Sequence, residues 1–244
     1  MTQLLLPLYS PPLFTFGNIV VHEGIEKAVS TVRSVYGSGD RPFPYLFIHG
    51  PHGTGKTHIL KAIVCLLKQR TDLGAGIVKF LTPEGDPPRF ENLKDLAFAD
   101  EMTGYEIRGL VIDDLHVLGQ DDTLHLWNLA NKLTRSGAPL IMSSLHSPEE
   151  VFFNNPHLKS RVTSGLVFIL EVPDDSIRTL ILDKMAKDRN VRLPHEVANY
   201  LVTRKSRNVK ELERLMEILD NESLRLKKRI TLSLVKYVEQ EGLL

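Results

Sequence analysis

The segment GPHGTGKT at residues 50–57 constrains this chain more than any other. It fits the pattern Gly-x-x-x-x-Gly-Lys-Thr, and it stands between the apolar run YLFIHG (45–50) and a helical pattern from Lys56 to about Arg70. Glycines let backbone N–H groups turn inward around phosphate groups, and the start of the following helix adds positive potential. The order of apolar strand, glycine-rich loop and helix therefore predicts a P-loop nucleotide site in an α/β fold.

Two residues of this loop have specific expected tasks. Lys56 reaches the β- and γ-phosphates of a nucleotide, and the Thr57 hydroxyl holds Mg²⁺. The expected cofactors are therefore ATP or ADP together with Mg²⁺. The residues expected to surround the phosphates are Pro51, His52, Gly53, Thr54, Gly55, Lys56, Thr57 and His58.

A second acidic element belongs with the loop. RGLVIDD (108–114) is an apolar strand that ends in two acids. Parallel sheets bind their ligands at the carboxyl ends of the strands, so Asp113 and Asp114 are expected beside the P-loop. Asp113 is expected to hold the water shell of Mg²⁺, and Asp114 to orient or deprotonate the attacking water.

Apolar runs alternate with helical patterns over most of the chain, which predicts a parallel sheet covered on both faces. After Pro173 only helical periodicity is found. We therefore expect a tail at residues 1–12, an α/β nucleotide-binding base at 13–172 and an all-helical domain at 173–244. The remaining apolar runs are IVKFL (77–81), APLIMSS (138–144) and SGLVFILEV (164–172), and further helical patterns cover 23–36, 124–133, 176–190, 196–205, 209–225 and 231–240.

Composition excludes several classes of protein. The 30 basic and 30 acidic residues leave no overall positive field of the kind that holds nucleic acid nonspecifically. The single cysteine, Cys65, forms no internal disulfide and fits a reducing cytoplasm. No segment approaches the length of a membrane span.

Other reactive residue types carry no separate site in the sequence. The nine histidines include none with a second ligand at a known metal spacing, so no metal beyond Mg²⁺ is expected. His116 and His125 are interpreted as surface or packing residues. Cys65 and Trp127 are interpreted as core residues.

Five segments, in this order, resemble the AAA+ ATPase domain of the bacterial replication initiator family DnaA. The resemblance runs from about residue 13 to the end. It implies that Val20 and Val21 lie near the adenine, and that the helices after Pro173 form a lid. It also implies that Arg161 is an arginine finger acting in trans, and that Lys210 is the second sensor. The segments are FTFGNIVVHEGIEKA (14–28), HGPHGTGKTHIL (49–60), GLVIDDLHVL (109–118), LKSR (158–161) and RNVKELERLM (207–216).

The amino-terminal run QLLLPL (3–8) narrows this resemblance. A DnaA-like ATPase preceded by such a tail is similar to the Hda family, which couples the sliding clamp of DNA polymerase to hydrolysis of DnaA-bound ATP. We accordingly expect no helix-turn-helix domain, no sequence-specific DNA binding and no initiator-type oligomerisation domain. The run lacks the basic residues of a signal peptide, and its prolines favour an extended chain. The residues expected to dock on the clamp are Gln3, Leu4, Leu6, Pro7 and Leu8.

Three positions depart from the family pattern. Leu145 stands where an acidic residue is usual, so only Ser143 or Ser144 can act as the first sensor, and Ser144 is the candidate. Lys210 replaces an arginine and keeps the charge without the bidentate fork. His157 replaces an additional arginine. These changes predict tight nucleotide binding, weak or absent intrinsic hydrolysis, and an activity exerted on the ATP of a partner.

The leading hypothesis is therefore a cytoplasmic regulator of chromosomal replication initiation that binds the clamp and stimulates hydrolysis of DnaA-bound ATP. One alternative, favoured by Leu145, is a nucleotide-gated adaptor that tethers DnaA or another partner to the clamp without catalysis. Another is a helicase-loader-type AAA+ protein, which the NIVV and NVKELE elements disfavour. Homo-oligomerisation stays open. The basic clusters 203–210 and 224–229 are interpreted as solvated helix faces, and single-stranded DNA contact by Lys132 and Arg135 stays a hypothesis.

Overall fold

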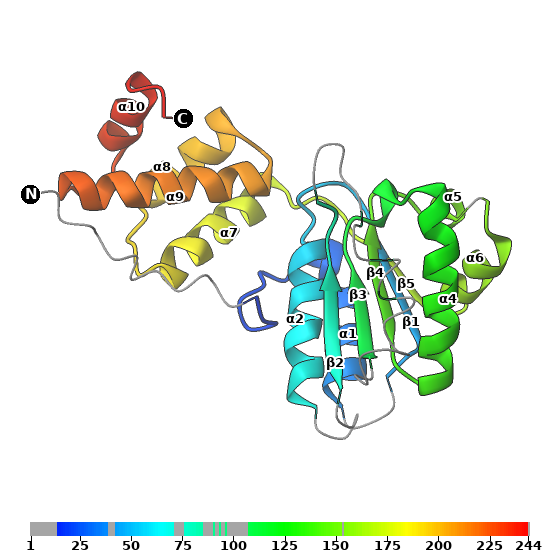
Figure 1. Cartoon of the computed structure of the whole chain (residues 1–244). Coiled ribbons are helices and arrows are strands. Elements are labelled where there is room, and N and C mark those ends of the chain that lie inside the picture. Colours follow the sequence, from blue (N-terminus) through cyan, green and yellow to red (C-terminus); the bar gives the residue numbers. More distant parts are fainter. Residues whose placement is uncertain are drawn as a thin grey trace, which may run out of the picture. The chain divides into compact units, whose positions relative to one another are not determined.

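The computed structural model describes residues 14–38, 42–70, 76–84, 90, 93, 96, 107–152 and 154–243. These residues form two compact units, a base at 14–172 and a helical unit at 173–243 (Figure 1). The proposed clamp-binding residues Gln3, Leu4, Leu6, Pro7 and Leu8 lie outside the described residues.

The base contains a parallel sheet. Within the described residues it has five strands in the order β2-β3-β4-β1-β5, and every neighbouring pair is parallel. The predicted parallel α/β sheet is confirmed. The strands are β1 (Tyr45–His49), β2 (Ile77–Leu81), β3 (Ile107–Ile112), β4 (Leu140–Ser144) and β5 (Leu166–Ile169).

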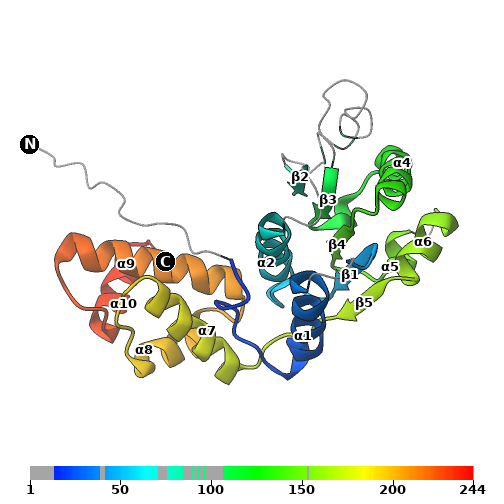
Figure 2. The same ribbon diagram turned by 90° about the horizontal axis from the view of Figure 1, so that it is seen from below.

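Helices cover both faces of the sheet, which gives three layers (Figures 1 and 2). Side chains alternate along a strand, so Leu46 and Ile48 pack toward α1 and α2, while Tyr45 and Phe47 pack toward the opposite layer. One layer contains α1 (Glu23–Gly37) and α2 (Lys56–Gln69), and the other contains α4 (Gln120–Ser136), α5 (Pro148–Val151) and α6 (Pro156–Thr163).

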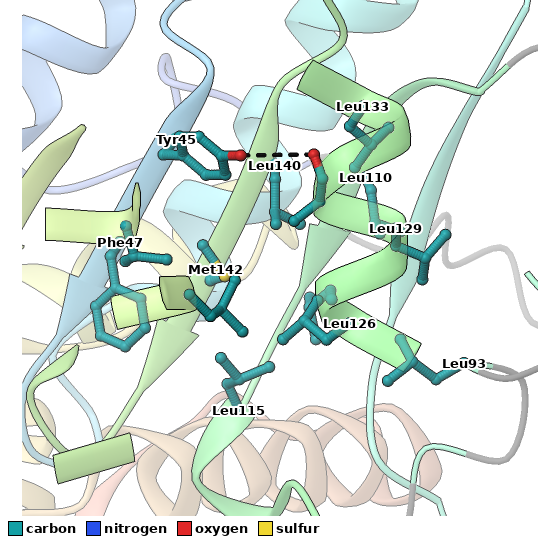
Figure 3. Close-up of a cluster of buried hydrophobic side chains, with 14 of the residues drawn as sticks. Tyr45, Phe47, Leu93, Leu110, Leu115, Leu126, Leu129, Leu133, Leu140 and Met142 are labelled. Atoms are coloured by element: carbon teal, nitrogen blue, oxygen red, sulfur yellow. Dashed lines mark hydrogen bonds between the residues drawn. The ribbon is translucent and has the colours of Figure 1, made fainter. Parts of the chain in front are cut away.

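Helix α4 is anchored on the sheet by one apolar face (Figure 3). Leu126, Leu129 and Leu133, spaced three and four residues apart, are buried with strand residues in one cluster. The Tyr45 hydroxyl forms a 2.6 Å hydrogen bond with Thr134 Oγ1, which ties the end of α4 to β1. This packing determines where the other side chains of α4 are presented.

Gly165, between α6 and β5, allows a close approach to β1. A Cβ atom there would lie 2.4 Å from the carbonyl oxygen of Tyr45 and 2.6 Å from its Cβ. Because backbone must move to relieve this clash, Gly165→Ala is expected to lower the free energy of unfolding by about 1–3 kcal/mol, measured by urea denaturation. In the control Gly37→Ala, the new methyl meets only Leu66 Cδ1, at 3.9 Å, so no loss is expected. Equal urea midpoints of unfolding for Gly165→Ala and Gly37→Ala would contradict a steric clash at Gly165.

The second unit is all-helical, as the periodicity predicts, and has its own core of residues such as Leu182, Met216 and Val235. The pattern at 196–205 was expected to be one helix, but it changes to a π-helix at Leu201. This wider turn accompanies burial of two consecutive residues, Leu201 and Val202. The elements are α7 (Asp175–Asp188), α8 (His195–Tyr200), the π-helix η2 (Leu201–Lys205), α9 (Val209–Leu226) and α10 (Leu232–Gln240).

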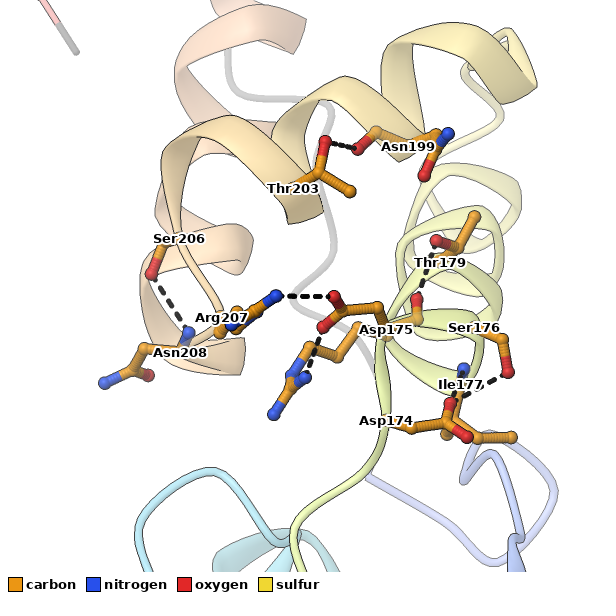
Figure 4. A network of polar contacts seen from close by, with 11 residues as sticks. Asp174, Asp175, Ser176, Ile177, Thr179, Asn199, Thr203, Ser206, Arg207 and Asn208 are labelled. Carbon is orange, nitrogen blue, oxygen red and sulfur yellow. Dashed lines mark hydrogen bonds and ion pairs between the residues drawn. The ribbon is translucent and has the colours of Figure 1, made fainter.

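A polar network joins the starts of α7 and α9 (Figure 4). Asp175 accepts hydrogen bonds from Arg207 at 3.0 Å and from Arg178 at 2.6 Å. These bonds, chiefly the one from Arg207, hold the pKa of the Asp175 carboxyl below its usual value. Asn208 caps α9 by accepting from the Lys210 N–H at 2.9 Å. The network therefore sets the position of Lys210 within its unit.

Among the helices that the structure describes, none is long and apolar enough to span a bilayer. Arg204 and Arg207 in the first basic cluster are exposed, as are residues 227–229 in the second, whereas the Lys205 side chain is 28% exposed and pairs with Glu239 at 2.7 Å.

Candidate nucleotide site and arginine finger

The loop between β1 and α2 depends on glycine conformations. Gly50, Gly53 and Gly55 have φ values of 144°, 78° and 92°, which residues with side chains rarely adopt. A Cβ at Gly50 would also lie 2.4 Å from the carbonyl oxygen of Leu170, so only glycine fits there. The loop is therefore curled in a way that suits the capture of phosphate by backbone N–H groups.

Lys56 is the buried cation of this loop, with 6% of its surface exposed. Its Nζ donates to the carbonyl oxygens of Gly50, at 2.6 Å, and Pro51, at 2.8 Å. Burial lowers the pKa of Lys56, while the negative charges of Asp114 and Asp113 oppose that change. The two acids that follow β3 thus lie within electrostatic range of the loop lysine.

Hydrogen bonds orient the acidic pair. Asp113, 2% exposed, accepts from the Ser143 hydroxyl and, at 3.1 Å, from the N–H of Asp114. The Asp114 N–H also reaches Ser143 Oγ at 3.1 Å. Asp114 itself has a positive φ of 53°, an uncommon conformation for a residue with a side chain. Ser143 therefore serves to hold Asp113.

Ser144 is left as the candidate for the first sensor. It is fully buried, and its Oγ accepts from the His146 N–H at 3.1 Å. The hydroxyl hydrogen of Ser144 can still be donated to a ligand. Leu145, the next residue, is half-buried and offers no polar side-chain atom.

The segment expected near the adenine is fastened to α2. The Phe14 ring makes an edge contact with His58 at 5.2 Å between centroids, and Lys61 Nζ lies 4.1 Å from its centroid. His58 Nε2 lies 3.1 Å from the carbonyl oxygen of Thr15. These contacts place Val20, half-buried, and Val21, 46% exposed, on a segment attached to the helix that starts at the P-loop.

Arg161 on α6 lies against α4. Its Nη1 donates to Asn131 Oδ1, and its guanidinium carbon lies 4.3 Å from the centroid of the Trp127 ring. The His157 ring lies 5.9 Å from the same indole. A hydrogen bond and a cation–π contact together hold the long side chain in one place. The sequence did not reveal Trp127 and Asn131 as its partners, because they precede Arg161 by about thirty residues.

The core interpretation is wrong for Cys65 and holds only in part for Trp127. Cys65 is half-exposed, and its thiol donates to the carbonyl oxygen of Phe14 at 3.5 Å. Trp127 is half-buried: it packs against the core cluster, and its ring also contacts Arg161 and His157. Cys65 therefore faces the segment that precedes α1, and Trp127 lies at the margin of the core.

Lys210, the candidate second sensor, belongs to the helical unit. Its side chain is exposed in the first turn of α9. Lys132 is half-buried and Arg135 exposed on α4.

The residues of the base fit a nucleotide with Mg²⁺. The curled loop and Lys56 suit phosphate groups, and the Thr57 hydroxyl and Asp113 carboxylate are oxygen ligands of the kind that Mg²⁺ takes. His116 Nδ1 is buried without a hydrogen-bond partner in the described part of the chain, a polar atom that a ligand could satisfy. Across the described residues, no three or more His, Cys, Asp or Glu side chains gather into a metal site.

Comparison with known proteins identifies the class. The family model described as the bacterial DnaA ATPase domain matches residues 11–169, and that of the Hda lid domain matches residues 175–238. An uncharacterized protein of Haemophilus influenzae is 30% identical over 206 residues, which are 82% of this chain and 84% of that protein. The chromosomal replication initiator DnaA of Symbiobacterium thermophilum is 29% identical over 211 residues, 84% of this chain and 45% of the initiator.

Solved structures agree on the fold. Domain III of Thermotoga maritima DnaA superimposes with a TM-score of 0.77 at 26% identity, covering 95% of this chain and 97% of that one. AMPPCP-bound DnaA from Aquifex aeolicus has a TM-score of 0.65 at 23% identity, covering 86% of this chain and 66% of that one, and shows the fold alone. The fold and site are thus those of an AAA+ nucleotide-binding protein. The chain belongs to the bacterial DnaA ATPase family, whose members act in DNA replication. Its lid domain is of the Hda type. It spans less than half the length of the DnaA relative from Symbiobacterium.

Proposed function

We propose that this protein regulates chromosomal replication initiation by stimulating hydrolysis of the ATP bound to DnaA. The observation that carries this proposal is Arg161, held by Asn131 and Trp127 in a base joined to an Hda-type lid. A planar guanidinium in a fixed position suits charge stabilisation at the γ-phosphate of a neighbouring subunit. Such a finger supplied in trans is worth on the order of 10³–10⁵ in rate.

The protein's own nucleotide serves a different purpose in this proposal. ATP or ADP binds at the P-loop, with Thr57 and Asp113 as holders of Mg²⁺ and Asp114 beside the site of water attack. Val20 and Val21 flank the adenine, and the lid contributes Lys210. Because Leu145 cannot polarise water and Lys210 lacks the bidentate fork, intrinsic hydrolysis is weak.

The sliding clamp is the proposed docking partner, through Gln3, Leu4, Leu6, Pro7 and Leu8. An extended peptide with one polar residue for register and alternate apolar side chains suits a surface groove. Ordering a short tail costs entropy, so one tail binds weakly. Tails from two copies would gain from the effective concentration on a ring-shaped clamp. The protein would act in the cytoplasm.

Removal of two tail side chains tests the docking. Gln3→Ala combined with Leu6→Ala is expected to weaken clamp binding at least about tenfold, because both the register and one apolar contact are lost. Leu5→Ala is the matched control, because Leu5 belongs to the same run but is not among the residues proposed to contact the clamp. Surface plasmon resonance on immobilised clamp measures both, and a nucleotide titration should give one affinity for all variants. Equal losses for the two changes would argue against register-specific docking.

A single-turnover assay tests the main proposal. DnaA loaded with γ-labelled ATP is mixed with clamp on DNA, with and without this protein, and release of phosphate is followed. Accelerated release supports stimulated hydrolysis. The second candidate, a non-catalytic adaptor, is favoured by Leu145 and predicts capture of DnaA on the clamp with an unchanged rate of release.

A further inference from the structure

Three histidines from separate segments meet at one edge of the sheet. His116, in the turn η1 (Leu115–Val117) after β3, has its ring centroid 6.3 Å from that of His52 in the P-loop and 6.2 Å from that of His146 after β4. Both contacts are edge-on, with interplanar angles of 79° and 82°. Since β3, β4 and β1 are neighbours, their carboxyl ends bring the three imidazoles together beside the phosphate loop. We call these residues the imidazole row.

The central ring of the row is electrically coupled to the P-loop. Burial lowers the pKa of His116, the Asp114 carboxylate raises it, and the charges of His146, His52 and Lys56 lower it further. His116 Nδ1 is buried and has no hydrogen-bond partner among the described residues. The pKa of the His116 ring is therefore held below its ordinary value by burial and by nearby positive charges, including that of the loop lysine Lys56.

Other charged groups face the same edge. The positive charge of His146 lowers the pKa of Glu150, although hydrogen bonds from Ser147 are the main cause of that shift. Burial lowers the pKa of His49, at the end of β1, while Glu149 and Glu150 raise it and Lys56 lowers it. Two carboxylates therefore act on the row, that of Asp114 on His116 and that of Glu150 on His146.

Phosphate binding reverses this balance of charge. The positive charge of Lys56 lowers the pKa of His116. A phosphate bound by Lys56 carries the opposite charge, so it raises that pKa. A nucleotide polyphosphate keeps net negative charge even with Mg²⁺ bound. An anion beside an imidazole favours the protonated form, and neighbouring rings share that proton as a coupled set.

We propose that His52, His116 and His146 are further ligands of the nucleotide's terminal phosphate, and that the row takes up a proton when that phosphate binds. The imidazolium supplies a charged donor next to the position where Leu145 has none. A triphosphate extends further from the loop than a diphosphate, so it recruits the proton more strongly. This inference rests on the proposed nucleotide site and is independent of the clamp and of DnaA.

The direction of the pH effect follows. In the free protein the pKa of His116 lies below its ordinary value of 6.5, and the bound phosphate raises it. Nucleotide affinity is therefore highest at acidic pH and is lost as the pH rises through the pKa of the bound state. A rise of about one pKa unit corresponds to about a tenfold gain in affinity only well below the pKa of the free state, and to a gain of about threefold between pH 8 and pH 6.

Calorimetry in buffers of different ionisation enthalpy measures the proton directly. Mg²⁺ with AMPPCP is titrated at pH 6.5 into the wild type and into the variant His52→Gln, His116→Gln, His146→Gln. Protonation changes of AMPPCP itself are the same in both titrations. The difference in proton uptake between the wild type and the variant therefore measures the contribution of the imidazole row. The wild type is expected to take up a measurable fraction of a proton that the variant does not, and to lose about threefold more affinity from pH 6 to pH 8. His195→Gln, an exposed histidine at the start of α8, is the control and should match the wild type.

The outcomes separate the two proposals. Equal proton uptake by wild type and variant, with nucleotide bound to both, would overturn the imidazole row. Binding of neither AMPPCP nor ADP by the wild type would overturn the nucleotide site and the row with it. Uptake as large for ADP as for AMPPCP would overturn the assignment to the terminal phosphate. Should the triple variant lose its fold, the pair His52→Gln, His146→Gln alters only exposed side chains and is expected to remove part of the uptake.

Discussion

Replacing Arg161 by alanine is expected to slow the stimulated hydrolysis of DnaA-bound ATP by about three orders of magnitude or more. The guanidinium is the group proposed to face the γ-phosphate of the partner, and no other side chain on α6 has the same fork of donors. Arg161→Lys is expected to recover little, because an ammonium cannot keep both the Asn131 hydrogen bond and a bidentate phosphate contact. Single-turnover release of phosphate from DnaA measures the effect.

The control for this prediction is an arginine of the opposite layer. Arg33→Ala, at an exposed position on α1, should leave the rate unchanged. Arg161→Ala itself should keep the wild-type affinity for nucleotide and clamp, since its contacts are with α4 at a half-buried position. A rate within about tenfold of the wild type would rule out a finger role for Arg161 and favour the adaptor alternative.

Replacing Lys56 by alanine is expected to weaken nucleotide binding at least about a hundredfold. The ammonium is buried in the loop and bonded to the carbonyl oxygens of Gly50 and Pro51. With phosphate bound, its removal leaves a desolvated anion without its nearest cation, a loss comparable to breaking a buried ion pair, about 3–5 kcal/mol. Each 1.4 kcal/mol is a factor of about ten in the dissociation constant, which a titration with fluorescent ADP measures.

Lys68→Ala is the matched control, because Lys68 is an exposed lysine in the last turn of the same helix. It removes one positive charge from α2 without touching the loop, and the affinity should stay at the wild-type value. A dissociation constant for Lys56→Ala within about threefold of that for Lys68→Ala would exclude the assigned role.

The pattern of residues along the chain predicted most of the fold. Strand β1, the P-loop and α2 follow one another within 25 residues, Tyr45–Gln69, so their order and chemistry are local and readable. The acids after β3 were predictable because parallel strands present their ends at one edge. The all-helical lid followed from its period of hydrophobic residues, and the π-helix at Leu201 did not, because it depends on which residues the core accommodates.

The contacts that define the candidate site depend on long-range packing. Arg161 was identified by resemblance, but its partners Trp127 and Asn131 meet it only because buried leucines fasten α4 to the sheet. Trp127 was expected in the core and does pack against it, but an apolar helical pattern could not show that its ring also contacts Arg161 on another helix. The histidines showed no ligand spacing in the sequence, since they lie on three different connections of the sheet.

The amino-acid sequence by itself determined the class of this protein, its phosphate loop, its acidic strand and the identity of the candidate finger. The loop and the acidic strand depend on neighbours in the chain and on strand order, so local physical chemistry carries them, whereas the class and the candidate finger Arg161 were identified by resemblance to a known family. Only the tertiary structure decided that Arg161 rests on Asn131 and Trp127, that Ser143 holds Asp113, and that three imidazoles stand together beside Lys56. Those groupings join residues from separate loops, and the burial of one shared core brings them within reach of one another.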